Sequence, residues 1–156
     1  EGPVVIRYPR GRGSQINYKN QIQPFTVASS RMLSHGQKIA VLSIGQIGVE
    51  VQKAIIEEHL QNNVTHIDMR CMKPLDLKVL GEIFRTFDKI ITIEESCLLG
   101  GFGQHVKALA QDSRYNGTIT SLGLPDAFVD HGEIDELRAK YGLSAQAIAK
   151  VISTLL

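Results

Sequence analysis

Two arginines and two glycines alternate near the start of the chain, in the run Arg10-Gly11-Arg12-Gly13. An arginine guanidinium is a planar fork of donors that pairs bidentately with phosphate or carboxylate. Glycine allows backbone N–H groups to approach an anion closely. The run therefore predicts either an anion-binding loop or a solvated turn without a ligand, and the residues alone leave both interpretations open.

A second stretch with residues suited to chemistry runs from Ile90 to Gly103. A short apolar run leads into Glu94-Glu95 and then into a glycine-rich loop that opens a helical pattern, which is where α/β proteins commonly bind a ligand or a partner. The two glutamates are not expected to act as an acid–base dyad, because adjacent strand residues point to opposite faces. One of them is expected to cap backbone N–H groups of the following loop or of a neighbouring domain. Cys97 has no histidine or lysine beside it that would activate a nucleophile.

The other motifs are weaker. The run Gly45-Gln46-Ile47-Gly48 follows an apolar strand, and Asp68 comes roughly twenty residues later, as in a dinucleotide fingerprint. The glycines are three apart, so the G-x-G-x-x-G pattern is not met, and a tight strand–helix turn is the alternative interpretation. The histidines are residues 35, 59, 66, 105 and 131, and no histidine or cysteine spacing among them matches a zinc site. His59 and His105 are expected on polar helix faces, and His131, in a loop with Asp130 and Glu133, is expected to form surface hydrogen bonds.

Size and composition narrow the function classes. The chain has 156 residues, which allows one domain or one domain plus a piece of another, and its net charge of +1 gives no electrostatic case for nucleic acid or a membrane surface. No apolar run approaches the length of a membrane span. The two cysteines, Cys71 and Cys97, are expected to be free thiols, which fits a reducing compartment. The start at Glu1, without an initiator methionine, is interpreted as the start of a fragment.

Apolar runs that alternate with helical patterns predict a three-layer α/β/α fold with a mostly parallel five-stranded sheet. A strand over residues 25–33 is expected to form an antiparallel edge through a turn at 34–37. Helices are expected to begin near Ile47, after an Asp76 N-cap, at Phe102, near Ile134 and after a Ser144 N-cap. The expected strands cover residues 3–8, 25–33, 39–44, 64–69, 90–93 and 118–122.

Four groups of residues, taken in order, carry a family resemblance. They are Ile6-Arg7-Tyr8-Pro9-Arg10-Gly11, Asp68-Met69-Arg70 with Lys73-Pro74-Leu75-Asp76, Glu94-Glu95 with Gly100-Gly101-Phe102-Gly103, and Gly123-Leu124-Pro125-Asp126 with Phe128 and His131-Gly132. Together they resemble the C-terminal part of the 1-deoxy-D-xylulose-5-phosphate synthases, thiamine-diphosphate enzymes of the transketolase family. The resemblance covers nearly all of the chain from Gly2 on, with residues 14–24 matching poorly.

This resemblance implies an enzyme that condenses pyruvate with D-glyceraldehyde 3-phosphate, releases carbon dioxide and begins the non-mevalonate isoprenoid route, with further use of its product in thiamine and pyridoxal synthesis. Thiamine diphosphate and Mg²⁺ would lie between two earlier domains. The present chain would then hold no cofactor, metal or catalytic residue and would be inactive alone. The full-length enzyme is expected to be a cytoplasmic homodimer whose remaining domains are the partners of this one.

By the same resemblance, residues 1–13 are the end of a preceding pyrimidine-binding domain, residues 14–24 are a linker and residues 25–156 are a transketolase C-terminal-like domain. Arg10 is expected to bind the substrate phosphate, and Arg7 to be buried against a neighbouring domain. The expected interdomain contacts also include Glu94, Glu95, Gly100, Gly101 and Gly103. Two alternatives stay open: the C-terminal domain of a 2-oxo-acid dehydrogenase β subunit, and an independent nucleotide-binding module using Gly45–Gly48.

Overall fold

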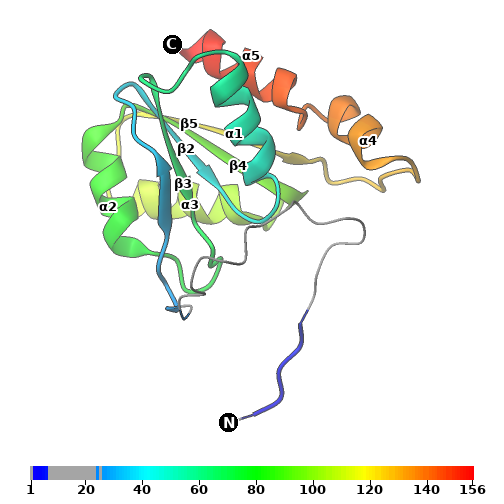
Figure 1. The fold of residues 1–156 in the computed structure, drawn as a ribbon. Coiled ribbons are helices and arrows are strands. Elements are labelled where there is room, and N and C mark those ends of the chain that lie inside the picture. Colours follow the sequence, from blue (N-terminus) through cyan, green and yellow to red (C-terminus); the bar gives the residue numbers. More distant parts are fainter. Residues whose placement is uncertain (1, 7–23, 25) are drawn as a thin grey trace.

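The computed structural model describes residues 2–6, 24 and 26–156. Its centre is a five-stranded sheet with the strand order β1-β3-β2-β4-β5 (Figure 1). Four strands run parallel: β2 (Ile39–Ser43), β3 (Val64–Asp68), β4 (Lys89–Cys97) and β5 (Thr118–Leu124). The edge strand β1 (Arg31–Ser34) pairs antiparallel with β3. The predicted fold class, including the single antiparallel edge strand, is confirmed.

Helices cover both faces of the sheet (Figure 1). Helices α1 (Gly48–Glu57) and α5 (Ala145–Leu155) pack with Ile39 and Val41 of β2 on one face. Helices α2 (Leu77–Thr86) and α3 (Phe102–Asp112) pack with Ala40 and Leu42 of the same strand on the other. Every residue of β2 is buried, as a central strand covered on both faces requires. The short helix α4 (Ile134–Lys140) precedes α5.

Two predicted helix caps are confirmed. The Asp76 carboxylate accepts the Val79 N–H at 3.1 Å, and it also accepts the N–H and hydroxyl of Ser30 at 2.9 and 2.8 Å. Burial raises the pKa of Asp76, but these hydrogen bonds outweigh burial and leave the pKa below its usual value. The Ser144 hydroxyl accepts the Ala147 N–H at the start of α5. Both caps are local signals that could be read from residue type and spacing.

The edge strand is antiparallel as predicted, but its predicted bounds, residues 25–33, are wrong. Residues 26–28 form a turn instead, with Ala28 at φ +59°, and the strand begins only at Arg31. The link that follows β1 turns beside the start of β3, where the N–H groups of Lys38 and Ile39 both donate to the Asn63 carbonyl. Because β3 and β4 occupy both edges of β2, β1 pairs with the outer edge of β3 and not with β2.

Two further expectations need correction. Residues 2–6 form no strand, and Val4, Val5 and Ile6 are 82, 94 and 80% exposed, since no described strand pairs with them. The helix expected near Ile134 forms, but an amphipathic helix would turn Ile134 inward, whereas Ile134 is 52% exposed and α4 contains no fully buried residue. Within the described part of the chain, no helix is long and apolar enough to cross a membrane.

Candidate interdomain surface

The four parallel strands have their carboxyl ends on the same side of the sheet. Glu94 and Glu95 lie on this side, near the end of β4. The two side chains point to opposite faces, as predicted. Glu94 is 1% exposed, whereas Glu95 has 37% of its side chain in contact with solvent. The two carboxylates therefore do not share a site, and an acid–base dyad is excluded by geometry.

The Glu94 carboxylate caps helix α3. One oxygen accepts the N–H of Phe102 and the other accepts the N–H of Gly103, each at 2.8 Å, and the Ser96 hydroxyl donates to the same carboxylate. The N-cap residue Gly101 has no side chain with which to satisfy these donors. A buried anion at a helix N-terminus also interacts favourably with the helix dipole. The expectation that one glutamate caps the following loop is confirmed.

The glycines next to Glu94 are required by contacts inside this domain. A Cβ atom on Gly101 would collide with the Cys97 carbonyl and the Glu94 carboxylate. A Cβ atom on Gly103 would lie 2.6 Å from the Thr92 hydroxyl oxygen. Gly100 has φ +73°, which disfavours other residues, but it has open space around it. Contact of these residues with a neighbouring domain stays a prediction, and the structure supplies a sufficient internal reason for Gly101 and Gly103.

Glu95 instead joins a surface network of charges. Its carboxylate accepts two hydrogen bonds from the Arg138 guanidinium, at 2.6 and 3.0 Å. Arg138 also contacts Glu50 at 3.4 Å, and Glu50 pairs with Lys53 at 2.8 Å, which raises the pKa of Lys53. This network connects α4 to β4 and α1, so Arg138 is a contact residue that the sequence patterns did not reveal.

The loop Gly45–Gly48 behaves as a tight turn. Gly45 has φ +84°, and a Cβ atom on Gly48 would lie 2.9 Å from the Ser43 hydroxyl oxygen. Glu50 is buried in the first turn of α1, where a nucleotide phosphate would have to bind. An anion there would meet a fixed negative charge. The geometry favours the turn interpretation over the nucleotide-binding one.

His66 is a buried polar residue whose role the sequence patterns missed. It lies in β3, is 0% exposed, and its Nε2 atom is 2.8 Å from the Ser43 hydroxyl oxygen. Its Nδ1 atom has no hydrogen-bond partner among the described residues. Burial lowers the pKa of His66 to about 4, so the ring is neutral at pH 7. Because Ser43 is also 0% exposed, this pair cannot reach a substrate and is a core contact.

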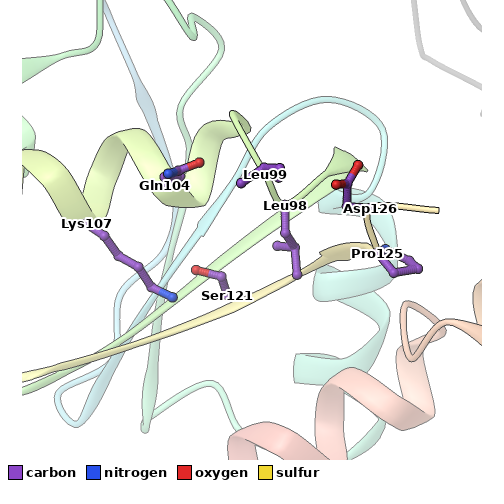
Figure 2. A pocket seen from close by; sticks show the side chains of 7 residues that line it. All are labelled: Leu98, Leu99, Gln104, Lys107, Ser121, Pro125 and Asp126. Carbon is purple, nitrogen blue, oxygen red and sulfur yellow. The ribbon is translucent and has the colours of Figure 1, made fainter.

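A shallow cavity of about 400 Å³ lies beside the Glu94 loop. Figure 2 shows Leu98 and Leu99 over its middle, Lys107 and Ser121 toward one end, and Pro125 and Asp126 at the other. Leu99 is 64% exposed, and the Gln104 side chain accepts the Gly100 N–H at 2.5 Å, which holds the loop against α3. An apolar centre with polar ends is typical of a protein contact surface.

The remaining candidates do not converge on a site. Cys71 and Cys97 are free and half-buried, and Cys97 lies 3.9 Å from the Asp126 carboxylate. In the described ranges, no group of three histidine, cysteine or acidic side chains could hold a metal ion. Arg7 and Arg10 lie outside the described residues. The features that remain for contact with another domain are the Glu94 loop, its cavity and the charge network around Arg138.

A family model described as the C-terminal domain of transketolase matches residues 28–148. The chain belongs to the transketolase C-terminal domain family. The match begins just before β1 and reaches into α5, so it includes the whole sheet and the Glu94 cap.

Curated relatives of this transketolase C-terminal domain are named 1-deoxy-D-xylulose-5-phosphate synthase. Those of Phocaeicola vulgatus and Cytophaga hutchinsonii are each 41% identical, over 97 and 99% of the chain. The synthase of Porphyromonas gingivalis is 39% identical over 100% of it. The chain spans only about a quarter of these relatives' length, 24, 24 and 25% respectively. These relatives favour neither the dehydrogenase β subunit nor the nucleotide-binding module.

Solved structures agree on the fold. One of them is described as a split-gene transketolase in the form of an inactive tetramer of beta subunits. It has a TM-score of 0.76 at 23% identity, and the match covers 85% of this chain and 43% of that one. The transketolase of Campylobacter jejuni has a TM-score of 0.58 at 14% identity, over 81% of this chain and 18% of that one. At these identities the similarity supports the fold and carries no residue roles.

The Glu94 cap generates the first prediction. Glu94→Gln replaces one acceptor oxygen with a donor, so one buried N–H loses its partner. We expect the free energy of unfolding, measured by urea titration, to fall by about 2–4 kcal/mol. Gly101→Ala should be at least as damaging, because the added methyl group meets backbone. Glu95→Gln is the matched control and should cost less than about 1 kcal/mol, since Glu95 is partly exposed. Equal losses for Glu94→Gln and Glu95→Gln would contradict the cap.

The buried imidazole generates a second prediction. The pKa of His66 is about 4 in the folded chain and 6.5 in the unfolded one, so only the unfolded chain takes up this proton between those values. Above pH 6.5, His66 is neutral in both states and does not lower the free energy of unfolding. As the pH falls from 6.5 toward 4, protonation of the unfolded chain lowers the free energy of unfolding, by about 3 kcal/mol in total. His66→Gln should therefore flatten the dependence of unfolding free energy on pH between pH 7 and 5. The exposed control His105→Gln should leave the slope unchanged, and a wild-type slope in His66→Gln would refute the assignment.

Proposed function

We propose that this chain is the C-terminal domain of a thiamine-diphosphate-dependent synthase that condenses pyruvate with D-glyceraldehyde 3-phosphate to 1-deoxy-D-xylulose 5-phosphate and carbon dioxide. The observation that carries the proposal is about 40% identity, over nearly the whole chain, to relatives named for this activity. The product would feed isoprenoid, thiamine and pyridoxal synthesis. The full-length enzyme is proposed to be a cytoplasmic homodimer.

The proposed role of the domain is structural and interdomain. The polar groups near the carboxyl ends of its strands already have partners inside the domain. Glu94 caps α3, Glu95 binds Arg138, and His66 contacts Ser43. Such a site offers little reactivity toward a substrate. The exposed Leu99 and the cavity beside it are better suited to packing against the remaining domains of the same enzyme.

The described residues do not fit thiamine diphosphate or Mg²⁺. A diphosphate commonly binds at a helix N-terminus, but buried carboxylates lie at the N-termini of α1 and α3, from Glu50 and Glu94 respectively. No described cluster of histidine, cysteine or acidic residues could hold a metal. The cofactor is therefore proposed to bind to other domains of the synthase, and no chemical step is assigned to this domain.

Substrate binding is proposed for one residue of the chain. Arg10, in the Arg-Tyr-Pro-Arg-Gly run, would pair with the phosphate of glyceraldehyde 3-phosphate, because guanidinium and phosphate form strong charge-assisted hydrogen bonds. Arg7 would be buried against a neighbouring domain. Residues 1–13 would complete the preceding domain, with residues 14–24 as the linker to the present one.

A chimeric enzyme tests this assignment. Residues 1–156 would replace the matching quarter of the Phocaeicola vulgatus synthase, and product formation would be followed with both substrates varied. We expect an active enzyme. In it, Arg10→Ala should raise the KM for the aldehyde by roughly tenfold to a hundredfold and leave the KM for pyruvate nearly unchanged. The exposed control Arg85→Ala should change neither. A folded but inactive chimera would contradict the proposed function, and an unaltered aldehyde KM would remove Arg10 from the substrate site.

Ligand-induced stabilisation tests the location of the cofactor. The 156-residue chain, heated with millimolar thiamine diphosphate and Mg²⁺, should unfold at the same temperature as without them, because a ligand stabilises only a protein that binds it. Millimolar ATP or NAD should likewise have no effect. The active chimera is the positive control for thiamine diphosphate. A clear upward shift with either class of ligand would contradict the account above.

A further inference from the structure

A second cavity lies at the opposite end of the parallel strands from the Glu94 loop. Its volume is about 420 Å³, and it is lined by residues from the second half of α2 and from the link between α3 and β5. Asp88 and Gly117, which line it, immediately precede β4 and β5. The cavity is therefore separate from the candidate interdomain surface, and the common ligand site of α/β folds, at the carboxyl ends of the strands, does not account for it.

The charged side chains that line this cavity have no charged partner inside the domain. Arg85, Asp88 and Arg114 form no ion pair with another described residue. All three are exposed, so a ligand in the cavity can reach them. At the carboxyl ends of the strands, by contrast, Glu95 is already bound by Arg138. A few polar groups that converge on one cavity are typical of a small-molecule site.

Gly81 gives an independent indication that the cavity is kept open. It lies inside α2, where glycine is less stable than alanine. Its φ is not positive, and a Cβ atom there would have the Arg85 guanidinium as its nearest neighbour, at an ordinary 3.5 Å. Contacts require Gly101 and Gly103 to lack a side chain, but no contact among the described residues requires this of Gly81. What the missing side chain does provide is space, because Gly81 lines the cavity.

The charges around the cavity favour a ligand that carries both signs. The guanidinium groups of Arg85 and Arg114 suit a carboxylate, with which arginine pairs bidentately. Asp88 suits an ammonium group and repels an anion with several negative charges. The carboxyl-terminal ends of α2 and α3 both lie at this cavity, and their partial negative charge also favours a cation. A multiply charged nucleotide is therefore not the expected ligand.

One wall of the cavity is aromatic. The rings of Phe84 and Tyr115 both line it, with their centroids 5.2 Å apart and their planes tilted by 34°. The Tyr115 hydroxyl donates to the Phe87 carbonyl at 2.9 Å, which fixes the ring in place. Both residues are half-buried, so part of each ring is left to contact a ligand. This wall suits an apolar or aromatic group next to the charged ones.

We propose that this cavity binds a free α-amino acid with an apolar or aromatic side chain. The ligand carboxylate pairs with the guanidinium groups of Arg85 and Arg114, and its ammonium group pairs with Asp88. Its side chain packs against Phe84 and Tyr115. The site is additional to the proposed synthase function and does not depend on it, so failure of either assignment leaves the other unaffected.

An NMR titration of the 156-residue chain with L-phenylalanine, up to about 10 mM, measures the binding. We expect saturable shifts in the backbone amide signals of Gly81 and Gly117, which line the cavity. 3-Phenylpropionate lacks the ammonium group and phenethylamine lacks the carboxylate, so each should bind at least tenfold more weakly. Inorganic phosphate should not displace L-phenylalanine. Absence of saturable shifts, or equal affinity for 3-phenylpropionate or phosphate, would overturn the proposal.

Charge variants test each half of the ligand separately. Arg114→Asn should raise the dissociation constant for L-phenylalanine at least fivefold, and asparagine tolerates the φ of +55° at this position. Asp88→Asn should weaken L-phenylalanine but not 3-phenylpropionate, so that the two affinities approach each other. Lys78→Gln, exposed on α2 and outside the cavity, is the matched control and should change neither. An unchanged dissociation constant in folded Arg114→Asn would contradict the site.

Gly81→Ala separates binding from stability. Alanine should raise the unfolding temperature by about 1–4 °C, because glycine in a helix loses more conformational entropy on folding. The same methyl group should raise the dissociation constant for L-phenylalanine severalfold, because it takes up space in the cavity. A variant that is more stable and binds L-phenylalanine as tightly as the wild type would contradict the placement of the ligand over Gly81.

Discussion

The buried carboxylate of Glu94 is the interaction on which the second half of this domain depends. It satisfies two N–H groups at the start of α3, both belonging to buried residues, and so fixes the point at which β4 ends and the helix begins. Gly101 must lack a side chain for the carboxylate to reach these donors. Phe102 can then pack into the core at 0% exposure. Without the cap, buried donors would be left without partners, which is costly in an apolar interior.

This arrangement explains why a stretch that has the appearance of a ligand loop has no free reactive group. Phosphate sites in α/β proteins use the positive end of a helix, but here protein carboxylates lie at that end of both α1 and α3. The features that this end of the domain leaves exposed are a loop, a shallow cavity and surface charge. The absence of a free reactive group at this loop is consistent with the length of the relatives, since the chain covers only about a quarter of each of them.

The two edge strands of the sheet differ in length and charge. Strand β1 is short and charged, and the salt bridge between Arg31 and Asp68 joins it to β3. These features favour an end of the sheet at β1. Strand β5 is uncharged and open, and it leaves the Glu94 loop and its cavity on the same side of the molecule. One side of the domain thus carries an open strand edge and an exposed Leu99, both of which favour contact with protein.

Much of the fold follows from the sequence, because its signals are local. Continuous apolar runs predict the buried parallel strands, the 3.6-residue spacing of Phe102, Val106 and Ala110 predicts α3, and Asp76 and Ser144 predict their caps. Alternation of side chains along a strand predicts that Glu94 and Glu95 point apart. Motif order alone also predicts the family, which the match over residues 28–148 supports.

Only the tertiary structure decided which strand β1 pairs with, because β2 has no free edge once β3 and β4 flank it. It also decided that Arg138 joins Glu95 to Glu50, and that His66 and Ser43 meet inside the core, since these partners are far apart in the chain. Residue types and spacing determine which local structure forms and which groups need a partner. The partners themselves depend on contacts between distant segments, and those exist only once the sheet and its helices have packed.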